Sequence, residues 1–84
     1  MPVPPSDHRI TLLSRAGCHL CDDARGVLLR VAAEVGTPIQ EQDVDTDPEL
    51  RARYGDYVPV ILIDGKEHGY WRVEEPRLRA ALAR

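Results

Sequence analysis

Cysteine is scarce in this chain, since only Cys18 and Cys21 occur among its 84 residues. A disulfide between them would close too small a loop to stabilise the fold much, because that stabilisation grows with loop length. A tetrahedral zinc site needs about four ligands, and no second CxxC motif accompanies the three histidines. The scarcity therefore argues against a disulfide-stapled scaffold and favours two thiols that react in turn.

Long hydrophobic runs and an excess of basic residues are also missing. No apolar run approaches the ~18 residues that span a bilayer, and residues 1–7 lack the basic and apolar regions of a signal peptide. We therefore expect a cytoplasmic protein that binds no membrane. In the cytoplasm a CxxC pair stays largely reduced. Eleven basic and fourteen acidic residues give a net charge of −3, which argues against nucleic-acid binding.

The length of the chain allows one domain. We expect this domain over residues 9–84, as a monomer, after a loose Pro-rich tail over residues 1–8. Apolar periodicity and turn residues predict the order strand, helix, strand, helix, strand, strand, helix. The predicted elements cover residues 9–14, 20–35, 39–44, 48 to about 55, 60–63, 66–71 and 74 onward. The first βαβ unit implies a parallel pair of strands, and Asp64-Gly65 predicts a hairpin that adds two antiparallel strands.

The first predicted helix should bury one apolar stripe and end at Gly36, ahead of Pro38. The stripe comprises Leu20, Ala24, Val27, Leu28, Val31 and Val35. The weakly apolar strand over residues 39–44 is expected at a sheet edge. The acidic residues that follow lack the full calcium-loop pattern, so Asp45 is interpreted as a turn residue and Asp47 as a helix cap.

The first helix places the two cysteines unequally. Residues three apart are neighbours on a helix, so the two sulfur atoms can meet. Cys18 lies at the N-terminus, where N–H groups and the helix dipole favour a thiolate and can lower a thiol pKa well below about 8.5. Cys21 begins the buried stripe. The pattern predicts that Cys18 attacks a substrate disulfide and that Cys21 resolves the mixed disulfide. His19 lies between them and would favour the thiolate when protonated.

Other hypotheses for this pair stay open. It could be structural or incidental, or belong to a non-catalytic redox-sensing or partner-binding module. It could also carry a metal. His8 and His68 are interpreted as solvated surface residues, and Tyr70 and Trp71 as residues that cap the core or line the rim of the site, with an aromatic platform for a partner as the alternative.

Three segments together make the chain resemble the thioredoxin superfamily, and most closely its short bacterial glutaredoxin-like proteins. These segments are Ser14–Cys21, Asp43–Asp45 and Tyr57–Gly65. The resemblance implies an α/β thioredoxin fold, with a four-stranded mixed sheet flanked by three helices, and dithiol–disulfide exchange as the activity. It also implies that Pro59 is cis and faces Cys18, and that the backbone of Val58 pairs with a bound substrate.

The same resemblance leaves two electron donors open. Arg15 occupies the position of a basic residue that helps hold the glutathione carboxylate in glutaredoxins. Tyr70-Trp71-Arg72 stands where glutaredoxins carry a glycine pair, and the bulky Trp71 argues against close approach of glutathione. A tryptophan in this region occurs in redoxins that are reduced by thioredoxin reductase. Glutathione and thioredoxin reductase are therefore both candidate reductants for a disulfide-containing protein or small-molecule substrate, with no bound cofactor or metal.

Overall fold

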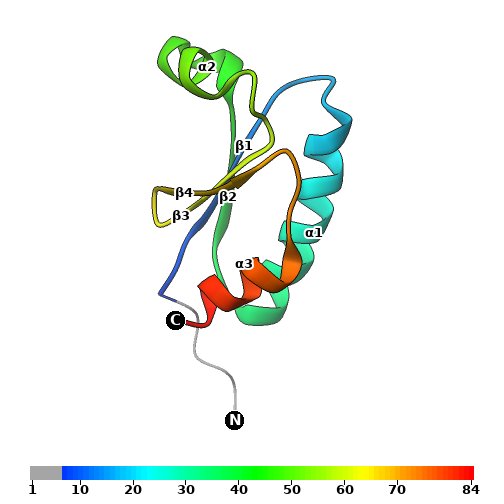
Figure 1. Ribbon diagram of the computed structural model, residues 1–84, viewed down its shortest axis with the longest axis vertical. Coiled ribbons are helices and arrows are strands. Elements are labelled where there is room, and N and C mark those ends of the chain that lie inside the picture. Colours follow the sequence, from blue (N-terminus) through cyan, green and yellow to red (C-terminus); the bar gives the residue numbers. More distant parts are fainter. Residues whose placement is uncertain (1–6) are drawn as a thin grey trace.

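The computed structural model describes residues 7–84, which form a four-stranded mixed sheet with helices on both faces (Figure 1). The elements are β1 (Ile10–Ser14), α1 (His19–Val35), β2 (Ile39–Asp43), the 3-10 helix η1 (Val44–Thr46), α2 (Pro48–Tyr54), β3 (Val60–Ile63), β4 (Lys66–Tyr70) and α3 (Glu75–Leu82). The predicted order of strands and helices is confirmed. Within the described residues, no helix is both long and apolar enough to cross a membrane.

The strands lie in the order β2-β1-β3-β4 across the sheet. β1 runs parallel to β2 and antiparallel to β3, which is antiparallel to β4. Leu13 pairs with Val60, which in turn pairs with Tyr70, and Ser14 pairs with Asp43. The segments that follow β1, β2 and β4 therefore meet the segment that precedes β3. β2 is an edge strand, as its weak hydrophobicity predicts.

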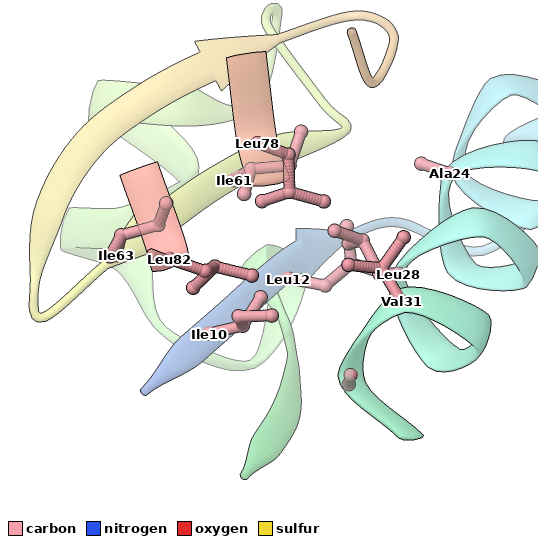
Figure 2. Close-up of a cluster of buried hydrophobic side chains, with 10 residues drawn as sticks. Ile10, Leu12, Ala24, Leu28, Val31, Ile61, Ile63, Leu78 and Leu82 are labelled. Carbon is pink, nitrogen blue, oxygen red and sulfur yellow. The ribbon is translucent and has the colours of Figure 1, made fainter. Parts of the chain in front are cut away.

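Apolar residues pack on both faces of the sheet. On one face, α1 and α3 cover the side chains of β1 and β3, and Leu28, Val31 and Leu78 are fully buried there (Figure 2). On the other face, a smaller cluster joins the strands to η1 and α2 through Leu13, Val44, Tyr54 and Val60. The candidate site lies where the segments between these elements meet at one end of the sheet.

Helix α1 follows the predicted stripe with one correction. Ala24, Leu28 and Val31 are buried, and Cys21 is buried as predicted, but Leu20, which was also placed in the stripe, is 50% exposed. Both residues precede Ala24 by one helical turn, so periodicity alone does not distinguish them. The helix ends as predicted at Gly36, whose φ of 70° lies in the left-handed region that glycine adopts without penalty.

The other turn signals are confirmed with small shifts of boundary. Asp47 caps α2 by accepting hydrogen bonds from the N–H groups of Glu49 and Leu50, and Asp64-Gly65 forms the hairpin turn with positive φ at both residues. β2 ends one residue before the predicted Val44, which begins η1. β4 ends before the predicted Trp71, because a φ of 72° at Trp71 turns the chain out of the strand.

His8 is not a freely solvated side chain, contrary to prediction. Its Nδ1 lies 2.6 Å from Asp64 Oδ2, and its Nε2 lies 2.8 Å from the carbonyl oxygen of Arg84. Both partners are acceptors, so both contacts are hydrogen bonds only when the imidazole carries two protons. The bond to Asp64 raises the pKa of His8, and the same bond lowers the pKa of Asp64. The predicted tail over residues 1–8 stays a prediction, because residues 1–6 lie outside the described residues.

The contact of His8 with Asp64 and Arg84 predicts a pH-dependent stability. A raised His8 pKa stabilises the fold below the ordinary value of 6.5, and this contribution is lost as pH rises through the folded-state pKa. The lowered Asp64 pKa contributes above 3.8 and is lost as pH falls through its folded-state value. We expect the stability difference between the wild type and His8→Asn to be largest between these pKa values and to shrink in alkali. Urea unfolding across pH measures it, and parallel profiles would contradict it.

Candidate active site

The two cysteines form a disulfide at the N-terminus of α1, with their Cα atoms 5.2 Å apart. Cys21 is buried with 1% of its surface exposed, whereas Cys18 is half-buried. Cys18 is also the N-cap of the helix, and its Sγ accepts a hydrogen bond of 3.1 Å from the backbone N–H of Cys21. The two sulfur atoms are therefore chemically unequal, because only Cys18 is both accessible and bonded to a first-turn N–H group.

The chain reaches this arrangement through the turn between β1 and α1. Gly17 has a φ of 75°, which an L residue with a side chain rarely adopts, and it directs the chain into the helix. Helix α1 then buries Cys21 in line with Ala24 and Leu28. The packed face of the helix fixes Cys21, and the cap position leaves Cys18 at the surface. His19 is exposed on the first turn of α1.

Val58 and Pro59 lie at the same end of the sheet as the cysteines, because Pro59 directly precedes β3. The Val58-Pro59 peptide bond is cis, as the resemblance implies. Pro59 is buried, and its carbonyl oxygen accepts a 2.7 Å hydrogen bond from the N–H of Trp71. The backbone of Val58 makes no backbone hydrogen bond to any other residue between 7 and 84. The pairing of Val58 with an extended substrate and the facing of Pro59 and Cys18 both stay predictions.

Arg15 is held by protein groups. Its Nε and Nη2 donate hydrogen bonds of 3.0 and 2.8 Å to the two carboxylate oxygens of Asp45, and its Nη1 donates to the carbonyl oxygen of Gly55. The Asp45 hydrogen bond is the main cause of the raised Arg15 pKa, to which the charges of Asp56 and Asp43 add. A carboxylate ligand at Arg15 would compete with a two-pronged ion pair that is already made.

Trp71 belongs to a cluster of half-exposed aromatic rings, which we call the aromatic platform: Tyr57, Tyr70 and Trp71. Their exposed fractions are 46%, 52% and 51%. Trp71 stacks on Tyr57 with centroids 6.4 Å apart and meets Tyr70 edge-on at 5.0 Å. The indole Nε1 of Trp71 donates a 3.5 Å hydrogen bond to the carbonyl oxygen of Asp56. Trp71 thus fills, in a left-handed conformation, the place where the resemblance expects glycine.

Beside the platform, on the α3 side, lies a hollow of about 410 Å³ whose lining includes His68, Trp71, Arg72 and Arg77. Burial, and after it the charge of Arg77, lowers the pKa of His68. His68 is half-buried in the wall of this hollow and is not the solvated residue that the sequence predicted.

A polar network under α1 was not predicted from the sequence. The buried Ser14 hydroxyl donates to Glu41, which also accepts two hydrogen bonds from Arg25. Arg25 reaches on to Asp22 in the first turn of α1. The bonds from Arg25 lower the pKa of Glu41 against the opposing effect of its burial. The network connects the first turn of α1, which carries the cysteines, to β2. The residues of α1 and β2 lie far apart in the sequence, so no local pattern predicts these contacts.

The structure offers the cysteine pair no further metal ligand. Between residues 7 and 84, no three or more His, Cys, Asp or Glu side chains are grouped in a way that could hold a metal ion. The hypothesis of a metal carrier therefore rests on the two thiols alone.

Gly55 supports the site through close backbone contact, which predicts a stability effect. A Cβ at this position would lie 2.6 Å from the carbonyl oxygen of Arg51 and 3.4 Å from Nη1 of Arg15. We expect Gly55→Ala to lower the free energy of unfolding by about 1–3 kcal/mol, as overpacked positions do.

Gly26→Ala is the matched control for Gly55→Ala. Gly26 lies within α1, and a Cβ there meets no atom within 4 Å. Alanine should stabilise the helix at this position by up to about 1 kcal/mol. Urea unfolding of both variants tests the pair, and equal shifts would contradict the close contact at Gly55.

The sequence profile described as Glutaredoxin-like domain (DUF836) matches residues 9–83, so nearly the whole described chain lies within the match. Uncharacterized proteins from Mycobacterium tuberculosis and Mycobacterium bovis are 44% identical over 81 residues, which cover 90% of this chain and 84% of each relative. The chain belongs to this glutaredoxin-like family.

Solved structures agree with the family and the fold. A protein from X. campestris is 39% identical, with a TM-score of 0.69, and the alignment covers 88% of this chain and 95% of that one. A protein from Nitrosomonas europaea superposes with a TM-score of 0.80 at 24% identity, covering 98% and 96% of the two chains. A thioredoxin from Halobacterium salinarum, 21% identical, has a TM-score of 0.68 over 92% of this chain and 73% of its own. The last two likenesses concern the fold alone and confirm it as the thioredoxin fold.

Proposed function

We propose that this protein is a thiol–disulfide oxidoreductase that reduces disulfides through Cys18 and Cys21. The observation that carries the proposal is the inequality of the two sulfur atoms. Cys18 is accessible and accepts the N–H of Cys21, a bond that stabilises a thiolate, whereas Cys21 is buried beside it. The family and the adjacent cysteine pair together indicate redox chemistry.

The reaction begins with the dithiol form. The Cys18 thiolate attacks one sulfur of the substrate disulfide, forms a mixed disulfide and expels the other substrate sulfur as a thiolate, which takes up a proton. The Cys21 thiol then loses its proton and attacks Cys18 Sγ, which forms the Cys18–Cys21 disulfide and releases the second substrate thiol. Two electrons pass from the protein to the substrate, and an external thiol reductant must return them.

The positions around the pair supply the remaining roles. The free backbone groups of Val58 are suited to hold an extended substrate beside the sulfur atoms, as an added strand would. Pro59, His19 and Trp71 form the proposed surroundings of the substrate, and Arg15 borders them. We place the reaction in the cytoplasm, where glutathione or thioredoxin reductase would return the electrons.

The test is a coupled assay with bis(2-hydroxyethyl) disulfide, a small neutral disulfide. NADPH oxidation is followed with glutathione and its reductase in one arm and with thioredoxin reductase in the other. Acceleration over the protein-free reaction in either arm supports the proposal and identifies the reductant. No acceleration in either arm, together with no stoichiometric reduction by the dithiol form, would leave a redox-sensing or partner-binding module as the better account.

A further inference from the structure

The charge around Arg15 is negative despite the guanidinium. Asp45 neutralises Arg15 through two hydrogen bonds, and Asp43 and Asp56 are close enough to raise its pKa through their charges. Neither Asp43 nor Asp56 forms an ion pair with any residue from 7 to 84. Arg51 is close enough to Asp45 for its charge to lower the pKa of that carboxyl group. Three carboxylates and two guanidinium groups thus lie near one another, so the place where an anionic ligand would be expected carries a net negative charge.

The same imbalance extends over the whole end of the sheet that holds the cysteines. Among the described residues of segments 15–23, 43–59 and 71–77, six carboxylates and three guanidinium groups have no ion-pair partner. The carboxylates are those of Asp23, Asp43, Asp47, Glu49, Asp56 and Glu74, and the guanidinium groups are those of Arg51, Arg72 and Arg77. Each of the other Asp, Glu and Arg residues of these segments is held in an ion pair. This end would attract a cationic partner and repel an anionic one.

The aromatic platform lies within this acidic end. Its three rings are mutually packed yet each is about half exposed, so ring faces and edges are open to a partner. Asp56 precedes Tyr57 in the chain, and its carbonyl oxygen accepts the indole N–H of Trp71. Exposed aromatic rings next to an acidic residue in the chain offer the chemistry that recognises guanidinium and ammonium groups, through cation–π and ionic contacts.

We propose that the disulfide partner is a polypeptide whose cysteine is flanked by arginine or lysine, and that these cations bind the aromatic platform beside Asp56. This inference rests on the proposed function and names its class of substrate. It also explains why Arg15 is paired: Asp45 removes the cation that would otherwise repel such a segment. The extended backbone of the partner would lie along Val58, and its basic side chains would reach Tyr57 and Trp71.

The experiment uses three short blocked peptides, each supplied as its symmetric disulfide. The single cysteine is flanked by arginine in the first, by glutamine in the second and by glutamate in the third. The rate at which the reduced protein reduces each peptide is measured in stopped flow and divided by the rate with dithiothreitol. This ratio removes the effect of the flanking charges on the peptide disulfide itself. We expect the arginine peptide to exceed the glutamate peptide by about tenfold or more at low salt, falling to about twofold in 0.5 M NaCl.

Two charge variants separate the local site from the net charge of the protein. Asp56→Asn should reduce the preference for the arginine peptide over the glutamine peptide by about threefold or more. Asp7→Asn removes the same charge from an exposed residue near the start of β1, at the opposite end of the sheet, and should leave the preference intact. Equal effects of the two variants would overturn the assignment of the site.

A ring variant tests the platform. Trp71→Gly suits the positive φ at this position and removes the ring without backbone conflict, so the arginine preference should fall in a folded protein.

The outcomes distinguish this inference from the function on which it rests. If the protein reduces the three peptides at the same relative rates as dithiothreitol does, the oxidoreductase function stands and the inference is wrong. If none is reduced, the proposed function fails. Binding to the platform is then measured by itself, in a titration of the oxidised protein with the arginine peptide whose cysteine is replaced by serine. Trp71 is the only tryptophan, so its fluorescence reports binding at the platform. A change with the arginine analogue and none with the glutamate analogue supports docking, and no difference between them overturns it.

Discussion

Cys18→Ser is expected to lose all turnover of a model disulfide, a fall of at least about a thousandfold, because only a thiolate attacks a disulfide at neutral pH. The first covalent step belongs to Cys18, which is half-buried and accepts the N–H of Cys21. The buried Cys21 cannot take over this step without exposure of the packed face of α1. The coupled assay with bis(2-hydroxyethyl) disulfide measures the loss.

Cys21→Ser should fail at a different step and so controls for Cys18→Ser. Its Cys18 still attacks the substrate, but no neighbouring thiol resolves the product, so one equivalent of mixed disulfide should accumulate in the absence of added thiol. Mass spectrometry under non-reducing conditions detects the adduct. If the adduct forms in Cys18→Ser and not in Cys21→Ser, the two roles are reversed.

Leu28→Ala is the substitution expected to cost the most stability. Leu28 is completely buried between α1 and the sheet (Figure 2). Removing its side chain from a packed core should lower the free energy of unfolding by about 2–5 kcal/mol. Small domains are stable by only about 5–15 kcal/mol in total, so the variant should melt well below the wild type.

Leu29→Ala is the matched control for Leu28→Ala, because the same change is made at the next residue of the same helix. Leu29 is 50% exposed, so its truncation should change the stability by no more than about 0.5 kcal/mol. Circular dichroism during urea unfolding measures both variants. Similar losses from the two would show that α1 packs on the sheet through another face.

The fold was predictable because its signals are local and agree with one another. Asp47-Pro48 begins a helix, Gly36 ends one, and Asp64-Gly65 closes a hairpin, each through the backbone conformation of a few residues. The error at Leu20 has a physical cause: both Leu20 and Cys21 fit the apolar stripe at the first turn of the helix, and packing on the sheet buries only Cys21.

The site was predictable only where its residues are neighbours in the sequence. The spacing of Cys18 and Cys21 indicated both roles, but Arg15 meets Asp45 across 30 residues, and no pattern near either residue announces the pair. The left-handed backbone of Trp71 was not predicted, because a bulky residue stands where a glycine would have indicated the turn.

The contact of His8 with the carbonyl oxygen of Arg84 has a consequence for engineering. It places the two ends of the described chain side by side (Figure 1), and both lie near the start of β1, away from the cysteines. A short peptide could join residues 8 and 84, and new ends could be opened at the Asp64-Gly65 turn. Such a circularly permuted domain, or the native domain inserted into a loop of a host protein, would present its cysteines outward.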